Sequence, residues 1–186
     1  MTAIPLYVSG KGMHATQATW EFKTLVITFL ERSGLGYDTR FRYYQELLEE
    51  PDSGRLAQII CDPVEYFDPD WPAYWQNRRQ GRDKDTVITE FMLQLDSRFR
   101  RQARGAIMCY DEAGVGTGIN TMRFLSQGKP ILGFYNPALR KRGINLHNIL
   151  QLPLEYPALV SLVSYDSPAT IEEAVERWVK GLTGSG

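Results

Sequence analysis

Short apolar runs alternate with longer amphipathic stretches along most of the chain, the order typical of an α/β protein. Four apolar runs predict buried strands, at residues 4–9, 105–110, 130–135 and 159–164. Four amphipathic stretches predict helices, at residues 16–32, 85–103, 116–126 and 168–182. This order predicts one domain over residues 1–182, an α/β fold with an open, doubly wound parallel sheet in a flavodoxin- or Rossmann-like three-layer sandwich. We expect residues 183–186 to form a flexible tail.

Glycine and acidic residues mark the ends of the expected helices. Gly34 follows the first amphipathic stretch and predicts a glycine C-cap, and Asp85 can cap the second helix with its carboxylate. The core-facing residues of the second helix are expected to be Val87, Ile88, Phe91, Met92, Leu95 and Phe99. Those of the closing helix are expected to be Ala174, Val175, Trp178 and Val179.

Residues 35–83 follow neither period clearly. Residues 37–44 suggest a strand and residues 44–50 a short helix. Residues 62–82 combine three Asp-Pro or Pro-Asp steps with five aromatic residues, namely Tyr66, Phe67, Trp71, Tyr74 and Trp75. This composition predicts a long aromatic loop. It is either a binding loop or a loop whose rings pack on the body of the protein.

Charge and composition exclude several classes of protein. The chain has 186 residues, 43% of them hydrophobic, and a formal net charge of −1, so it is neither disordered nor attracted as a whole to a polyanion. We therefore expect no nucleic-acid polymer as a partner. A run of arginines at positions 98, 100, 101 and 104 indicates the solvated end of a helix rather than a binding patch.

Cysteine and histidine usage argues against disulfides and metals. Cys109 falls in a buried strand, so Cys109 and Cys61 are expected to be free thiols in a reducing compartment. His14 and His147 have no neighbour at a ligand spacing, and we expect neither a metal nor a cofactor. The amino-terminal residues form no basic leader and no long apolar stretch, which favours a cytoplasmic protein without membrane contact.

Two glycine-rich segments follow expected strands. The first is Ser9-Gly10-Lys11-Gly12, and the second runs from Asp111 to Gly118 with glycines at 114, 116 and 118. Glycines let the backbone approach a ligand closely, and the N-terminus of the following helix attracts a phosphate or another anion. Asp111 and Glu112 could bind ribose hydroxyls or supply a general base. A tight turn needed only for packing would use the same glycines.

Residues 106–150 resemble the nucleoside 2-deoxyribosyltransferase family and the related 2'-deoxynucleoside 5'-monophosphate N-hydrolases. The matching residues are Ile107 to Tyr110, Gly116-Thr117-Gly118, Gly128-Lys129-Pro130 with the apolar residues after them, and Ile144 to Leu146. Ser9 and Gly10 fit the first loop of the family. The resemblance implies action on an N-glycosidic bond, a nucleoside or nucleotide as the partner, and a homo-oligomer whose sites can borrow residues from a neighbouring subunit.

The chain departs from this family at its catalytic positions. By the family's spacing, the nucleophilic glutamate falls on Asn120, and a neutral amide cannot form the covalent glycosyl intermediate. The aspartate before the glycine turn falls on Gly114, and the aspartate of the preceding helix falls near Asp96. Asp96 is equally explained as a solvated helix charge. The Gly116-Thr117 turn is also similar to the glycine turn of the lysine decarboxylase-like phosphoribohydrolases. By the spacing of that family, the catalytic glutamate again falls on Asn120.

Three functional hypotheses remain from the sequence. In the first, the protein is a nucleoside or nucleotide N-glycosidase or glycosyltransferase whose carboxylate is supplied by Glu112, Asp111 or Glu90. In the second, it is a catalytically inactive nucleotide-binding module. In the third, it is an interaction protein that uses the aromatic segment. In the first case, the catalytic residues are Glu112, Asp111, Asp96 and Asn120, the last orienting the sugar. The substrate-binding residues are Ser9, Gly10, Gly12, Gly116, Thr117, Gly118 and Trp71, whose ring would stack on the base.

Overall fold

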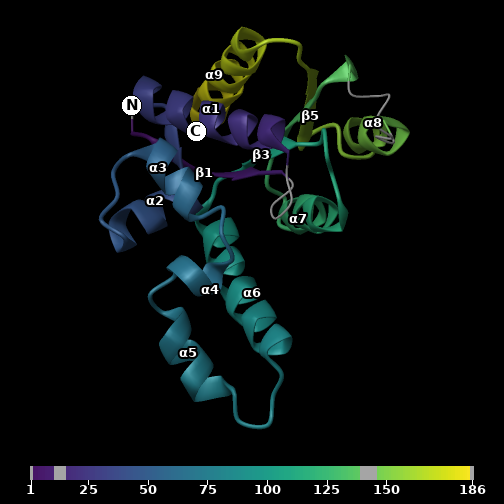
Figure 1. The fold of residues 1–186 in the computed structure, drawn as a ribbon. Helices are drawn as coiled ribbons and strands as arrows, with labels where there is room; N and C mark the ends of the chain where they lie inside the picture. The colour runs from purple at the N-terminus through teal and green to yellow at the C-terminus, as the bar shows by residue number, and fades with distance from the viewer. Residues whose placement is uncertain (1, 11–15, 139–145, 185–186) are drawn as a thin grey trace.

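The computed structural model describes residues 2–10, 16–138 and 146–184, which form the expected α/β sandwich. Its centre is a five-stranded parallel sheet with the order β2-β1-β3-β4-β5 (Figure 1). The strands are β1 (Ile4–Ser9), β2 (Gly36–Asp38), β3 (Ala106–Cys109), β4 (Ile131–Tyr135) and β5 (Val160–Ser164). The chain winds outward from β1 in one direction and from β3 in the other, so the doubly wound topology is confirmed.

Helices cover both faces of the sheet and complete the three layers. One face carries α1 (Gln17–Ser33) and α9 (Pro168–Gly184) (Figure 1). The other face carries α2 (Thr39–Leu47), α6 (Lys84–Gln102), α7 (Val115–Leu125) and α8 (Leu146–Glu155), while α3 (Ser53–Ile59) packs on α1 and α2. Within the described ranges, no helix is both long and apolar enough to cross a bilayer.

Successive residues of β3 belong to two separate cores, one on each face of the sheet. Ile107 of β3 belongs to the cluster that contains Val26 of α1 and Val175 of α9. Its neighbour Met108 belongs to the opposite cluster, with Phe99 of α6. Each such side chain contributes about 1.5–3 kcal/mol when it is fully buried. The uninterrupted apolar sequence of β3 therefore reflects burial on both faces, as predicted.

The strand expected at 37–44 and the helix expected at 44–50 are wrong. β2 ends at Asp38, and α2 begins at the next residue. One oxygen of Asp38 accepts the amide hydrogens of Arg40 (2.9 Å) and Phe41 (2.8 Å), and the other accepts that of Val8 on β1 (2.6 Å). This N-cap starts a helix among aromatic residues that locally favour a strand.

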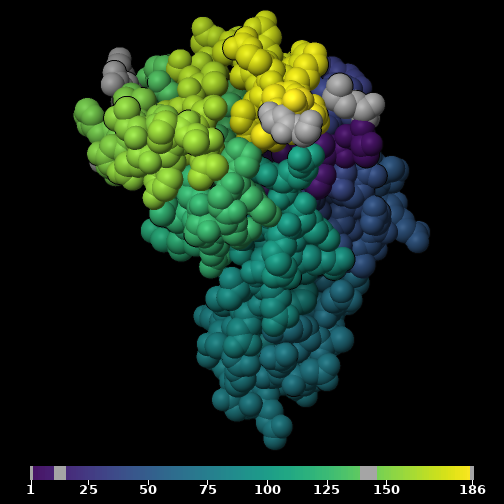
Figure 2. Space-filling model, turned by 180° about the vertical axis from the view of Figure 1, so that it is seen from behind, coloured from purple at the N-terminus to yellow at the C-terminus, as the bar shows by residue number. Residues whose placement is uncertain are grey.

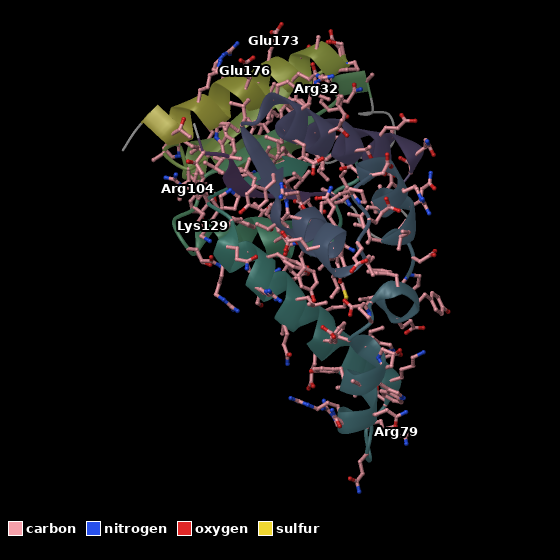
Figure 3. All side chains as sticks on the ribbon, turned by 90° about the vertical axis from the view of Figure 1, so that its left-hand side faces the viewer. Arg32, Arg79, Arg104, Lys129, Glu173 and Glu176 are labelled. Atoms are coloured by element: carbon pink, nitrogen blue, oxygen red, sulfur yellow. The ribbon has the colours of Figure 1, made fainter. Side chains whose placement is uncertain are left out.

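The aromatic segment 62–82 is not the long loop expected from its composition. It contains α4 (Val64–Phe67) and α5 (Trp71–Arg78), and α5 packs on the first half of α6. The ring centroid of Phe91 lies 5.5 Å from that of Trp71. The three helical segments form a lobe that extends away from the sheet (Figures 1 and 2), with Arg79 at its tip (Figure 3). Of the five aromatic residues only Tyr66 is largely exposed, at 74%.

The helix ends agree with the sequence in part. Gly34 adopts the left-handed conformation after α1, with φ of 65°, as expected. The cap of α6 is Asp83 rather than Asp85, because Asp83 Oδ1 accepts the amide hydrogen of Thr86 at 2.8 Å. Helix α8 was not expected, since it is short and contains a proline. α9 continues through Gly184, so the first two residues of the expected tail at 183–186 are helical, and the last two lie outside the described part.

The arginine run at the end of α6 is only partly solvated. Arg98, Arg101 and Arg104 are exposed as expected, but the side chain of Arg100 is 3% exposed. Lys129 Nζ donates to the backbone carbonyl oxygens of Arg100 and Arg101, at 2.5 and 3.0 Å. A cation at this position interacts favourably with the C-terminal end of the helix dipole.

The packing of β4 yields a test at Gly133. A Cβ atom there would lie 2.5 Å from the ring of Tyr110, whose hydroxyl group is held 3.0 Å from Thr121 Oγ1. We expect Gly133→Ala to lower the free energy of unfolding by about 1–3 kcal/mol, because the ring cannot move without strain. Urea titration followed by circular dichroism measures this change.

The matched control is Gly181→Ala in α9, where an added Cβ meets no described atom within 4 Å. This variant should gain about 0.5–1 kcal/mol, because alanine favours the helix over glycine. Equal stability of the two variants would contradict the close approach of Tyr110 to β4.

Candidate functional site

Gly10 after β1 lies beside the end of β3, where the sheet changes its winding direction. β1 pairs with β2 on one side and with β3 on the other. Helix α1 leaves β1 on one face of the sheet, and α7 leaves β3 on the other face (Figure 1). Ligands of open α/β sheets bind in the crevice between two such loops. The structure brings Ser9, Gly10 and residues 111–118 to this edge, as the sequence suggested.

The start of α7 is open. Gly114 occupies the N-cap position, and no described side chain caps the helix. Gly114, Gly116 and Gly118 are exposed, and an added Cβ at any of them would meet no described atom within 4 Å. The first amide groups of a helix have no partner within the helix, and none in the described ranges accepts from residues 115–117. The positive end of the α7 dipole therefore faces outward with unsatisfied donors.

Thr117 adds an unsatisfied polar atom to this turn. The residue lies in the first turn of α7 and is 3% exposed. Its Oγ1 has no hydrogen-bond partner among the described residues, and no other buried side-chain atom of that part of the chain shares this state. An unsatisfied buried hydroxyl group costs about 1–3 kcal/mol. A bound polar ligand or a bound water molecule would remove this cost.

Glu112 is committed to the start of α1. Its Oε2 accepts hydrogen bonds from the Thr16 amide (2.9 Å), the Thr16 hydroxyl (2.9 Å) and the Thr19 hydroxyl (2.6 Å). A carboxylate at a helix N-terminus is stabilised by the dipole and by the free amide groups. Glu112 thus compensates the positive end of the α1 dipole with a charge from the protein itself. This role differs from the ribose contact or general base expected from the sequence.

Asp111 holds together the ends of three strands. Its Oδ1 accepts the amide hydrogen of Asn136 after β4 at 2.6 Å, and its Oδ2 accepts from the Tyr165 hydroxyl group after β5. Burial, followed by the hydrogen bond to Asp111, raises the pKa of Tyr165 far above its usual range. Burial also raises the pKa of the neighbouring Cys109 thiol to about 12, so this thiol stays protonated. Asp111 is itself buried and serves as a structural tie.

Asn120 faces the body of the protein and joins α7 to α6 and β1. Its Oδ1 accepts from Arg100 Nη1 at 2.9 Å, and its Nδ2 donates to the Tyr7 hydroxyl oxygen at 3.3 Å. Arg100 also donates to Ser97 Oγ at 3.1 Å and lies 3.6 Å from Asp96 Oδ2. Burial, then the Asp96 charge, raises the pKa of Tyr7 well above its usual range. Asn120 is therefore part of a partly buried polar cluster.

The remaining expected site residues have different surroundings. Ser9 is buried, and Gly10 packs so closely that an added Cβ would lie 3.2 Å from Cys109 Cβ. Gly12 lies outside the described residues. Trp71 is 5% exposed in the core of the lobe, with its ring against α6, so a stacking role for it at this edge has no support from the fold.

Sequence reasoning missed several residues of this region. The arginine run masked Arg100, although its position four residues after Asp96 places both on the same side of α6. Asn136 follows β4 and Tyr165 follows β5, so the carboxyl ends of the strands could have indicated both. Nothing in the sequence around Thr16 and Thr19 announces their bond to a glutamate 93 or more residues away.

The chemistry available at this edge is mainly that of anion binding. The amide groups of α7 supply donors without a Cβ in the way, whereas both nearby carboxylates are engaged in structural hydrogen bonds. Among the described residues, no group of three histidine, cysteine, aspartate or glutamate side chains could hold a metal ion. Among the described residues, the site therefore offers hydrogen-bond donors for an anionic oxygen. Both carboxylates beside it already accept structural hydrogen bonds.

The role of Glu112 leads to a stability test. We expect Glu112→Ala to lower the free energy of unfolding by about 1–2 kcal/mol, since α1 loses its capping carboxylate. Glu112→Gln keeps an acceptor oxygen but loses the charge, so its loss should be smaller. Urea titration of both variants measures the difference. Unchanged stability in both would show that the carboxylate is not the cap of α1.

Comparisons with known proteins add no family to this picture. No protein-family model matches the chain, and no curated protein matches it at a significant level. The resemblance of residues 106–150 to the nucleoside 2-deoxyribosyltransferase family thus stays a prediction from the sequence. The parallel sheet and the open turn after β3 are compatible with it, but they occur in α/β proteins of many functions.

Proposed function

We propose that the protein binds a small phosphorylated ligand, a nucleotide, at the start of α7 and does not cleave it. The observation that carries the proposal is the uncapped, glycine-lined first turn of α7 at the switch point of the sheet. A phosphate group would accept hydrogen bonds from the free amide groups of residues 115–117. The Oγ1 of Thr117 is buried in the same turn, so the exposed amide groups alone carry the proposal.

The state of the acidic residues favours binding over cleavage. N-glycosidic cleavage through a covalent intermediate needs a nucleophilic carboxylate, and hydrolysis by inversion needs one free to activate water. Asp111 and Glu112 each accept hydrogen bonds from other elements. Glu90 lies in the lobe, where both of its oxygens accept from Arg82. Each of these carboxylates would lose structural bonds if it moved to serve a reaction.

An N-glycosidase is the second candidate, and the cluster around Asn120 favours it. The Tyr7 hydroxyl group, Arg100 and Asp96 converge on this residue from two other elements. Such a group of interacting titratable residues is a common feature of active sites. In an N-glycosidase of this kind, Asp96 would supply the carboxylate, because it is the acidic residue of this cluster. Oligomerisation and a cytoplasmic location, both inferred from the sequence, belong to the same proposal.

The binding proposal is tested by placing a carboxylate at the start of α7. Gly114 has an extended backbone (φ −111°, ψ −171°), which suits an aspartate N-cap. We expect Gly114→Asp to weaken binding of AMP and of inorganic phosphate at least tenfold, a loss of about 1.4 kcal/mol or more. The same variant should keep or slightly raise the melting temperature, because the new side chain caps α7. Isothermal titration calorimetry and thermal unfolding measure the two effects.

Gln80→Glu is the matched control, since it adds the same charge at an exposed position in the lobe. It should leave both ligand affinities unchanged. Equal affinity of Gly114→Asp and the unmodified protein would contradict the proposed anion site. Loss of affinity in both variants would indicate a general charge effect instead.

The glycosidase candidate has its own measurement. We expect no release of free base when the protein is incubated with a panel of nucleosides and nucleotides and analysed by chromatography. Base release that falls at least a hundredfold in Asp96→Asn would favour the enzyme, because general acid–base catalysis contributes about 10²–10⁴-fold. Gln102→Glu, an exposed change near the same end of α6, is the control.

A further inference from the structure

A cavity lies between α1 and α3, and no described residue of α7 lines it. Its volume is about 540 Å³, within the range of about 300–1,000 Å³ typical of small-molecule sites. One wall consists of α1 residues that include Trp20, Glu21 and Leu25, and the other of α3 residues with Cys61 at their end. None of the described residues of the loops after β1 and β3 lines it.

Small residues of α3 create this space. Gly54 and Ala57 line the cavity, and an added Cβ at Gly54 would meet only Asp52 Oδ1 among the described atoms within 4 Å. Leu56, in the same helix, is fully buried in the core cluster. α3 is therefore anchored through Leu56 while its smaller residues stand opposite the indole ring of Trp20.

The indole ring of Trp20 is held in place from behind. Lys23 Nζ lies 4.4 Å from the ring centroid, and the Lys23 side chain is itself buried. A cation over one face of an indole ring is an attractive and specific contact. The remaining surface of the ring lines the cavity, together with Leu25. This wall suits a flat aromatic ligand, which gains both apolar burial and ring stacking.

The charged groups around the cavity are one carboxylate in the described lining and the Lys23 ammonium group behind Trp20. Glu21 is the sole charged residue in the described lining, and its Oε1 accepts from Gln17 Nε2 at 3.1 Å. Gln58 adds a neutral amide group on the opposite wall. A carboxylate beside an aromatic wall attracts an ammonium group and repels a phosphate. The cavity thus differs in its charge preference from the open turn of α7.

We propose that this cavity binds a small aromatic ammonium compound, with its ring against Trp20 and Leu25 and its amine at Glu21. The apolar wall accounts for the ring, and the single carboxylate accounts for the charge. The proposal is independent of nucleotide binding at α7, since the two positions share no residue and take ligands of opposite charge.

Cys61 provides a direct readout of occupancy. It is exposed and lines the cavity, whereas Cys109 is buried with a pKa raised to about 12 and does not compete for a thiol reagent. The rate of Cys61 alkylation by iodoacetamide, followed by intact-protein mass spectrometry, is measured with increasing tryptamine. We expect saturating tryptamine to slow the reaction at least fivefold. Indole, which lacks the amine, should protect at least tenfold more weakly.

Two variants and one control separate the ring contact from the charge contact. Glu21→Gln should raise the half-protecting tryptamine concentration about tenfold and leave indole unchanged. Trp20→Leu should abolish protection by both compounds, with circular dichroism confirming the fold. Glu173→Gln, on the exposed side of α9 (Figure 3), should behave as the unmodified protein. No protection by tryptamine, or equal protection in Glu21→Gln, would overturn the proposal, and neither result would bear on phosphate binding at α7.

Discussion

The positive dipole ends of two helices determine the electrostatics at the C-terminal ends of the strands. α1 and α7 both begin there, so both direct the positive ends of their dipoles towards the same edge. Glu112 satisfies α1 with three hydrogen bonds, although it belongs to the loop that leads into α7. The loop thus provides an internal anion for one helix and none for its own. An external anion is the natural complement of the second.

Hydrogen bonds hold the loop between β3 and α7 in place. Asp111 connects β3 to the ends of β4 and β5, and Glu112 connects the same loop to α1. Two successive carboxylates therefore fix the backbone just before the glycines of α7. Flexible glycines would otherwise lose entropy on binding a ligand. Anchoring at Asp111 and Glu112 reduces that loss, because the chain is already ordered up to Gly114.

The sequence determined the fold more clearly than the site. Short apolar runs identified β1, β3, β4 and β5, most clearly β3, which is apolar and buried along its whole length. The glycine after the first amphipathic stretch identified Gly34 as a C-cap. The sequence pattern failed between residues 35 and 83, where the Asp38 cap and the packing of Trp71 on Phe91 override local preference. The open turn of α7 could be foreseen from its glycines. The long-range bonds of Glu112 could not, since their partners have no distinguishing pattern.

The surroundings of Asn120 also bear on whether a carboxylate at this position could act as a nucleophile. A carboxylate at this position would lie beside Arg100, whose side chain is 3% exposed and already 2.9 Å from the amide oxygen. Such a buried pair would hold the carboxylate as the partner of the guanidinium and reduce its availability as a nucleophile. The neutral amide suits this position because it accepts from Arg100 and donates to Tyr7 at once. Asparagine therefore satisfies both neighbours, and a carboxylate at this position would be held by Arg100.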